Sequence, residues 1–416
     1  MELSIFGAVS RDSQSFSPPE SPKTDNPLRF GILGAADIAP DALIFPAKSH
    51  PDVIIQAVAA RDQEKAKAYA EKHGIPEVKG SYQAEMLDDP KIDCVYIPLP
   101  NGLHYEWSLK ALKAGKHILV EKPSFNNTTE AESIYHHSVL SSSGAPKPLI
   151  LLEAVHYLFH PAWAKFMSFV SPQDVVRAKA TLLAPASMFN NDNIRFRYEL
   201  AGGAIMDLGS YTSSALVRIF GGVAEACEEA VFKPTTYDAR CDQNYNVKYR
   251  FPGGRVGVME GDLKASFDQF FPMLDVEHRP VIISSADAGV DVVEGQEVIR
   301  TRKLKFTNFV VPHVGHSIQV EDEFAVRKIG EEKAVMKTWK KSETIQTYTF
   351  REAEIEQDGE PFWTTYRYQL EQFVNKVRGR ETAQWVDGDR TTDTLRMIDM
   401  AYTAGKFPLR LTSEYK

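Results

Sequence analysis

The sequence has few cysteines, no long hydrophobic run and no excess of positive charge. Its three cysteines, Cys94, Cys227 and Cys241, form no CxxC pair. We therefore expect a reducing compartment, by default the cytoplasm, and neither a disulfide framework nor a zinc site. No stretch reaches the roughly 18 apolar residues of a membrane span, and the first residues lack the pattern of a secretory signal. The net charge of −8 leaves no electrostatic footprint for nucleic acid or an anionic membrane, so we expect small molecules as partners.

What the sequence does contain is typical of a folded protein with two domains. A chain of 416 residues, 43% of them hydrophobic, is too long for one ordinary core. Residues 10–27 are rich in serine and proline, and we expect residues 1–27 to be a disordered leader. The fold should therefore begin at Leu28.

Short apolar runs alternate with helical patterns after this leader. The runs cover residues 30–33, 53–59, 94–97, 117–120 and 149–153, and the helical patterns cover residues 38–48, 63–73, 105–114 and 128–140. Alternating strands and helices predict a parallel sheet, and we place this domain at residues 28–150. Strand-like runs dominate afterwards, with two late helical patterns at 363–377 and 391–403. We expect residues 151–416 to form an α+β domain on an open, mostly antiparallel sheet.

The turn after the first expected strand has the composition of a dinucleotide site. Its sequence, Gly34-Ala35-Ala36-Asp37-Ile38-Ala39, fits G-x-A-x-x-A. Gly34 would make the tight turn, Ala36 would let a pyrophosphate approach the backbone, and Ala39 would permit close packing of helix on strand. Because this turn is the first of an alternating series, we expect a Rossmann domain. The expected cofactor contacts here are Gly34, Ala36, Asp37 and Ile38.

The end of the second expected strand indicates which cofactor is bound. A fold that prefers NAD places an acidic residue there to accept the ribose hydroxyls, whereas this strand is followed by Ala60 and Arg61. Because an arginine can pair with a 2′-phosphate through its planar fork, Arg61 favours NADP. The alternative is that Arg61 is solvated and Asp62 binds the ribose.

The apolar run of residues 117–120 stops at Glu121-Lys122-Pro123. In an open α/β sheet, ligands bind just beyond the carboxyl ends of the strands. An isolated tripeptide of this kind would more simply be a solvated strand end. The motifs on either side of it favour a functional site, in which Lys122 transfers a proton or holds a substrate hydroxyl.

Three motifs in this order carry a family resemblance. They are Pro98-Leu99-Pro100-Asn101-Gly102-Leu103-His104, then Val120-Glu121-Lys122-Pro123, then Gly202-Gly203-Ala204-Ile205-Met206-Asp207-Leu208-Gly209-Ser210-Tyr211. The chain resembles the glucose-fructose oxidoreductase and inositol dehydrogenase (Gfo/Idh/MocA) family. Within it, the chain is most similar to the branch of dimeric dihydrodiol dehydrogenases and NADP-dependent D-xylose dehydrogenases. The resemblance runs from about residue 28 to 222 and more faintly through 366–402.

The resemblance implies roles for these residues. Lys122 points into the active site, Glu121 contacts the nicotinamide ribose, and the bond between Lys122 and Pro123 is often cis. The expected cofactor contacts from these two motifs are Leu99, Pro100, Asn101, His104, Glu121, Lys122 and Pro123. The expected catalytic residues are Lys122, Asp207 and Tyr211. Tyr211 is the acid or base, because Lys122 would stabilise its phenolate, and Asp207 orients either the substrate hydroxyl or Lys122.

Two positions depart from the family pattern. In the segment after the cofactor domain, Leu158 stands where relatives commonly have arginine, and His156 where dihydrodiol enzymes have an aromatic residue. Both are expected to line the substrate with Asp207 and Tyr211, so the substrate of close relatives does not carry over directly. His156 and His160 have a spacing seen in metal sites, but on an extended segment they would lie roughly 13 Å apart. We therefore expect no metal.

The sequence thus predicts an NADP-dependent oxidoreductase. It would move a hydride between nicotinamide and a CH–OH carbon of a sugar or cyclic diol, in the manner of a D-xylose 1-dehydrogenase or trans-1,2-dihydrodiol dehydrogenase. One alternative is an NADPH-dependent reductase of a specialised-metabolite ketone or imine. Another is a non-catalytic NADP-sensing regulatory protein. By analogy with the family, we expect a homodimer or a higher homo-oligomer.

Overall fold

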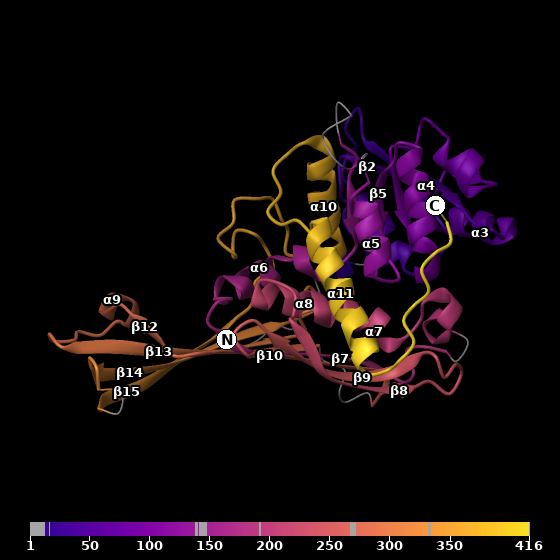
Figure 1. Cartoon of the computed structure of the whole chain (residues 1–416). Helices are drawn as coiled ribbons and strands as arrows, with labels where there is room; N and C mark the ends of the chain where they lie inside the picture. Colours follow the sequence, from indigo (N-terminus) through magenta and orange to yellow (C-terminus); the bar gives the residue numbers. More distant parts are fainter. Residues whose placement is uncertain are drawn as a thin grey trace.

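The computed structural model of the chain describes residues 13–15, 17–137, 140, 148–190, 193–266, 272–331 and 334–415. These residues form two sheets with helices between them (Figure 1). The smaller sheet belongs to the N-terminal part of the chain and the larger one to the rest. The expected two-part fold is therefore confirmed.

The first sheet is parallel, with strand order β3-β2-β1-β4-β5-β6. This is the order of a dinucleotide-binding Rossmann fold, in which the crevice opens between the first and fourth strands. The central strands are almost wholly buried, as expected when helices cover both faces. The strands are β1 (Leu28–Leu33), β2 (Val53–Ala59), β3 (Glu77–Lys79), β4 (Cys94–Ile97), β5 (His117–Val120) and β6 (Leu151–Glu153).

Local sequence signals set the helices of this domain. Helix α3 begins where the Asp62 carboxylate accepts from the backbone N–H of Lys65, and it ends at Gly74 in the left-handed conformation. The predicted helix at 38–48 is instead a π-helical turn followed by a short α-helix. Pro46 lies inside this stretch and has no N–H to donate. The helical segments are η1 (Pro40–Ile44), α2 (Phe45–Lys48), α3 (Gln63–His73), η2 (Tyr82–Leu87), η3 (Asn101–Leu103), α4 (His104–Lys113) and α5 (Thr128–Tyr135).

Two expected boundaries change. Strand β6 pairs with β5 in the parallel sheet, so the first domain extends to Glu153 rather than ending at residue 150. Residues 1–12 and 16 of the expected leader lie outside the described residues. Residues 17–27 form no helix or strand, but they are not disordered, because Lys23 Nζ donates to the carbonyls of Ala47 (2.7 Å) and His50 (2.9 Å).

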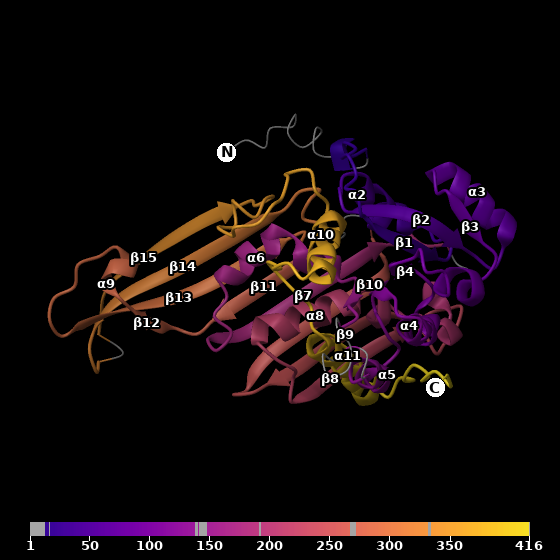
Figure 2. The same cartoon turned by 90° about the horizontal axis from the view of Figure 1, so that it is seen from above.

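The second sheet has nine strands, in the order β15-β14-β13-β11-β7-β10-β9-β8 with β12 paired to β13. Only the β7–β10 pair is parallel among the described strands, so the expectation of a mostly antiparallel sheet is confirmed. Strands β12 to β15, together with the short helix between β12 and β13, extend beyond the other helices as an arm (Figure 2). The strands are β7 (Val175–Pro185), β8 (Ala226–Pro234), β9 (Asp242–Phe251), β10 (Arg255–Ala265), β11 (Met273–His278), β12 (Val281–Ile283), β13 (Gln296–Thr307), β14 (Ser317–Lys328) and β15 (Val335–Ile345).

Helices α6, α8, α10 and α11 of the second domain lie on the side of its sheet that faces the first domain, whereas α9 lies on the arm (Figure 1). Helix α8 packs on β7 and β10, α11 packs on α8 and on α5 of the first domain, and α10 packs on η5 and on η1 and α2 of the first domain. The long helices α10 and α11 therefore connect the two domains. The helical segments are η5 (His156–Phe159), α6 (Pro161–Ser168), η6 (Ile194–Phe196), η7 (Tyr198–Leu200), α7 (Ala204–Asp207), α8 (Gly209–Phe220), α9 (Ser285–Ala288), α10 (Thr365–Arg378) and α11 (Gly388–Ala404).

The chain after α11 returns to the first domain (Figure 1). Asn126 donates to the carbonyl of Leu411 (2.9 Å), and the backbone N–H of Ser413 donates to Glu130 (2.6 Å). This C-terminal segment, residues 405–415, therefore holds the second domain against the start of α5.

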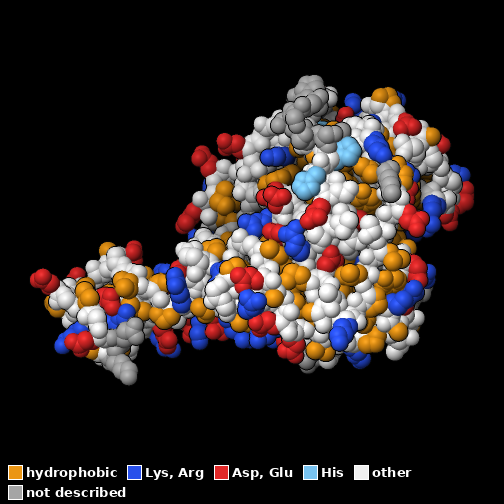
Figure 3. All heavy atoms as spheres, viewed as in Figure 1, with side chains coloured by type: hydrophobic (Ala, Val, Ile, Leu, Met, Phe, Trp, Pro, Cys, Tyr) orange, Lys and Arg blue, Asp and Glu red, His pale blue; other side chains and the backbone are white. Residues whose placement is uncertain are grey.

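The surface shows mixed charge. On the face seen in Figure 3, lysine and arginine side chains are interspersed with aspartate and glutamate side chains. Within the described ranges, no helix has the length and apolar character needed to cross a bilayer.

Candidate active site

The turn between β1 and η1 has the conformation of a dinucleotide-binding turn. Gly34 has φ +109°, and its N–H donates to the carbonyl of Ala59 at the end of β2 (2.7 Å). A Cβ at this position would lie 3.1 Å from Leu99 Cδ2, which belongs to the loop after β4. The turn and this loop thus meet at the crevice between β1 and β4. Asp37 and Ile38 follow as exposed residues and Ala36 as a partly exposed one.

The chain after β2 presents an exposed arginine, and the acidic residue that follows it caps a helix. Arg61 is exposed, two residues after the strand. Asp62, the alternative ribose ligand, uses its carboxylate to cap α3 (3.0 Å to the Lys65 N–H). Arg61 is thus an exposed cation at the end of β2, beside the turn.

The loop after β4 is fixed on both sides. Asn101 donates its side-chain amide to the carbonyl of Ala201 in the second domain (3.1 Å). His104 was expected to lie along the cofactor, but its side chain has no exposed surface. Its ring nitrogens lie 2.7 Å from the carbonyl oxygen of Leu99 and 2.9 Å from that of Pro123. His104 therefore holds the two loops of the site together rather than facing a bound nucleotide, and burial lowers its pKa to about 4.

The Glu121-Lys122-Pro123 motif leaves β5 with a cis bond between Lys122 and Pro123. Tyr96, on β4, donates its hydroxyl to Glu121 Oε1 (2.6 Å). Burial raises the pKa of the Glu121 carboxyl. The glutamate thus lies in the floor of the site.

Lys122 forms the central contact between the domains. Its Nζ donates to the carboxylate (2.6 Å) and to the backbone carbonyl (3.0 Å) of Asp207. Asp207 is the last residue of α7 and is 8% exposed. These two residues, both expected in the active site, are therefore in direct contact.

Arg195 is a second cation that pairs with Asp207, and no sequence motif predicted it. Its Nε donates to the other carboxylate oxygen (2.6 Å), and its guanidinium carbon lies 4.2 Å from the centre of the Phe189 ring. Although burial opposes ionisation, Arg195 and Lys122 together hold the pKa of Asp207 well below its ordinary value. Arg195 stands in a short turn without a motif, so its partner could not be read from the sequence.

The Gly202-Gly203 turn before α7 packs on a buried ion pair. Arg410 and Asp242 have no exposed side-chain surface, and their charged groups lie 2.9 Å apart. Arg410 also donates to the carbonyl of Gly202 (2.7 Å), and Asp242 accepts from the backbone N–H of Ile205 (2.6 Å). Gly203 has φ +129°, and a Cβ there would overlap both members of the pair. The turn therefore requires glycine and fixes the start of the helix that carries Asp207.

Tyr211 differs from the expectation drawn from the family. Lys122 Nζ lies 4.5 Å from the centre of the Tyr211 ring, and it donates its hydrogen bonds to Asp207. The hydroxyl of Tyr211 lies 3.0 Å from His156 Nε2 instead. Burial, and then the neighbouring Tyr366 phenol and the Glu121 carboxylate, raise the pKa of Tyr211 well above that of an ordinary tyrosine. Among the described residues, the hydrogen-bonding neighbour of the Tyr211 hydroxyl is therefore His156 and not Lys122.

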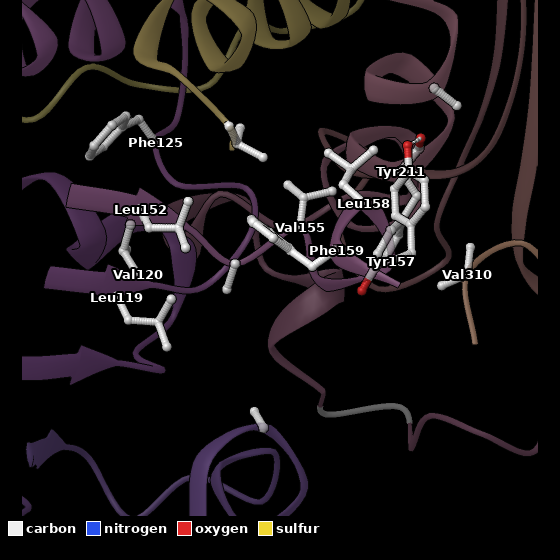
Figure 4. Packing of buried hydrophobic residues seen from close by; sticks show 14 of the residues in the cluster. Leu119, Val120, Phe125, Leu152, Val155, Tyr157, Leu158, Phe159, Tyr211 and Val310 are labelled. Carbon is white, nitrogen blue, oxygen red and sulfur yellow. Dashed lines mark hydrogen bonds between the residues drawn. The ribbon is translucent and has the colours of Figure 1, made fainter. Parts of the chain in front are cut away.

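His156 and Leu158, expected to line the substrate, are 1% and 2% exposed. Leu158 belongs to the buried cluster that also contains Tyr157, Phe159 and Tyr211 (Figure 4). Leu158 is therefore packed in the core beside Tyr211. His156 is likewise buried, next to the Tyr211 hydroxyl.

His156–Phe159 form a 3-10 turn, and His160 follows as the N-cap of α6, so the stretch between the two histidines is not extended. His160 accepts from the backbone N–H of Ala162 (3.2 Å), and His156 is held by Tyr211 and Thr365. In the part of the chain that the structure describes, no group of three or more metal-ligating side chains is found.

Comparison with known proteins gives consistent results. A family model described as "Oxidoreductase family, NAD-binding Rossmann fold" (GFO_IDH_MocA) matches residues 28–139. The D-xylose 1-dehydrogenase (NADP(+)) 2 of Haloferax volcanii is 32% identical over 263 residues, 61% of this chain and 74% of that protein. The trans-1,2-dihydrobenzene-1,2-diol dehydrogenase of Xenopus tropicalis is 28% identical over 242 residues, 57% of this chain and 70% of that protein.

Solved structures share the same architecture. A 3-ketoreductase from Actinomadura kijaniata, in complex with NADP and TDP-benzene, matches with a TM-score of 0.66. The match covers 91% of this chain and 98% of that chain, at 20% sequence identity. At this identity, the likeness shows the fold.

Proposed function

Because the chain belongs to the Gfo/Idh/MocA oxidoreductase family, with its NAD(P)-binding Rossmann fold, we propose that it is an NADP-dependent enzyme of sugars or cyclic diols. It would transfer a hydride between nicotinamide and a CH–OH carbon. One observation carries the proposal: the Lys122–Asp207 ion pair joins the carboxyl end of β5 to the second domain. Ligands of open α/β sheets bind beyond these strand ends.

The residues around the crevice fit a dinucleotide. At Gly34, a side chain would close the space between the turn after β1 and the loop after β4. Ala36 and the exposed Asp37 and Ile38 leave the backbone of the turn accessible. When bound, NADP supplies or accepts the hydride.

The chain itself supplies the polar groups for the proton. Lys122 would hold the substrate oxygen, and Asp207 would keep the lysine in place through its ionised carboxylate. Tyr211, whose ring lies beside the Lys122 ammonium group, would exchange the proton with the substrate oxygen.

A substrate panel tests the activity. We would follow NADPH absorbance with D-xylose, D-glucose, myo-inositol and a cyclic trans-1,2-diol, for the wild type and for Lys122→Met. The variant should keep NADP affinity within a few-fold and lose more than about 90% of kcat, a barrier change above roughly 1.4 kcal/mol. Lys67→Met, a change of an exposed lysine on α3, is the matched control. Tight NADP binding without turnover on any compound would instead favour a cofactor-sensing protein.

Cofactor preference has its own test. Arg61→Ala should weaken NADP by roughly 1.5–3 kcal/mol, the worth of a hydrogen bond to a charged group, and leave NAD nearly unchanged. Arg29→Ala is the control. Arg29 lies near the start of β1, at the end of the strand away from the dinucleotide turn, so this change should alter neither affinity. Equal losses for both cofactors would show that Arg61 does not bind the 2′-phosphate.

A second candidate is the reverse direction, reduction of a ketone or imine by NADPH. In this direction Tyr211, which keeps its proton at neutral pH, would give that proton to the substrate oxygen. The same panel, run with the corresponding carbonyl compounds and NADPH, distinguishes the two directions by their kcat/KM values.

A further inference from the structure

The nearest polar partner of the Tyr211 hydroxyl is a histidine and not the active-site lysine. His156 Nε2 lies 3.0 Å from the phenol oxygen, whereas Lys122 Nζ is bonded to Asp207. His156 therefore offers a hydrogen-bonding group behind the Tyr211 hydroxyl.

The His156 ring is held on every side. Its Nδ1 lies 2.8 Å from the Thr365 hydroxyl at the start of α10, and its plane packs against the Tyr366 ring with centres 4.1 Å apart. Only 1% of the side chain is exposed. Burial, followed by the nearby His313 and Lys122, lowers the pKa of His156 well below the ordinary value. The ring is therefore neutral, with one N–H and one bare nitrogen.

Resting on the proposed function, we propose that His156 is a positioning residue for Tyr211. Its Nε2–H donates to the phenol oxygen, and the Thr365 hydroxyl donates to Nδ1. With that donor in place, the hydrogen of the Tyr211 hydroxyl is left for the substrate oxygen. In the other tautomer, with the proton on Nδ1, the Tyr211 hydroxyl would donate its hydrogen to His156 Nε2 and not to the substrate.

The proton balance is simple. In the reducing direction, the substrate carbonyl carbon gains a hydride from the reduced nicotinamide cofactor, and its oxygen gains the proton as the Tyr211 O–H bond breaks. His156 keeps its own proton, and its hydrogen bond becomes charge-assisted because its acceptor is now a phenolate. Oxidation runs through the same steps in reverse.

The electrostatic surroundings make this donor important. Burial, the Tyr366 phenol and nearby carboxylates disfavour a phenolate at Tyr211. Arg195 favours it, and the Lys122 ammonium group lies over the ring face. A hydrogen bond to the oxygen itself therefore has a large effect. The titratable and charged groups around the Tyr211–His156 pair are Glu121, Lys122, Tyr157, Arg195, Asp207, His313 and Tyr366.

Kinetics as a function of pH test the proposal. With the best compound of the panel, His156→Phe should lower kcat roughly 10- to 100-fold and move the pH limb of oxidation to higher pH. His156→Gln retains an N–H donor and should recover to within roughly 10-fold of the wild type. His160→Phe is the matched control, because this buried histidine of the same segment contacts the rings of His316 and Tyr368 and not Tyr211. It should lower the melting temperature and leave the pH limb in place.

A wild-type rate and pH limb in His156→Phe would overturn the proposal, as would equal defects in the Phe and Gln variants. A second measurement needs no turnover. Nitrogen-15 NMR of histidine-labelled protein, with the His156 signals assigned by their loss in His156→Gln, should show the proton on Nε2. A proton on Nδ1 would refute the proposed donor even if the enzyme is active. Absence of turnover with the proton on Nε2 would count against the proposed function alone.

Discussion

The buried Arg410–Asp242 pair should be the most sensitive point of the second domain. Arg410→Met keeps the apolar stem and removes the guanidinium, which leaves the Asp242 carboxylate without a cation in a site that has no exposed surface. Breaking such a pair from one side costs about 3–5 kcal/mol. The hydrogen bond to Gly202 is lost as well. At roughly 2–4 °C per kcal/mol for a domain of this size, we expect the melting temperature to fall by roughly 6–20 °C.

Thermal unfolding followed by circular dichroism is the assay, with a double-mutant cycle as its control. Asp242→Asn alone should also destabilise, because Arg410 is then the unpaired charge. The double variant Arg410→Met/Asp242→Asn should be less destabilised than the sum of the two, because neither charge remains. A fall of less than about 2 °C for Arg410→Met, or strict additivity in the cycle, would refute the assignment of this pair as a support of the Gly202-Gly203 turn.

Three further changes have defined outcomes. Gly203→Ala should reduce soluble yield and cost at least about 2 kcal/mol, because its Cβ overlaps the buried pair and φ is +129°; a wild-type melting temperature would contradict this. Asp207→Asn should lower kcat by about 100-fold or more, since Lys122 loses its anionic partner, while NADP affinity in titration calorimetry stays within a few-fold. For His104, burial lowers the folded-state pKa to about 4, against an ordinary value near 6.5. The unfolded state therefore binds the proton first. The contribution of neutral His104 to the free energy of unfolding is therefore complete above about pH 6.5 and is lost as the pH falls toward 4. A melting temperature that stays constant from pH 7 to 4.5 would contradict this prediction.

The elements of the first domain could be predicted closely because their signals are local. The ranges expected for β2, α3, β4 and β5 agree with the structure, since apolar runs, the Asp62 cap and the Gly74 stop lie within the segments themselves. Strand β3 has only three residues, all partly exposed, and gave no run to detect. Strand β15 is almost entirely exposed, so its sequence lacks the alternation that marks a half-buried strand.

The site was predictable as a set of residues and less so as a set of contacts. Lys122 and Asp207 were expected together and meet at 2.6 Å. Which group faces the Tyr211 hydroxyl depends on side-chain direction across three elements, and no spacing encodes that. The sequence also could not show that Arg195 shares Asp207, because the two lie twelve residues apart across an irregular segment.

The C-terminal segment and the end of α10 attach the second domain to the first at separate places. Asn126 bonds to the carbonyl of Leu411 on one side, and Arg380 pairs with Asp52 at 2.9 Å on the other. A hinge motion that opened the crevice would have to break both attachments, at about 0.5–1.5 kcal/mol per hydrogen bond. Together the two attachments oppose such a motion by about 1–3 kcal/mol and do not prevent it. The radius of gyration in small-angle scattering, with and without NADP, measures whether the crevice opens.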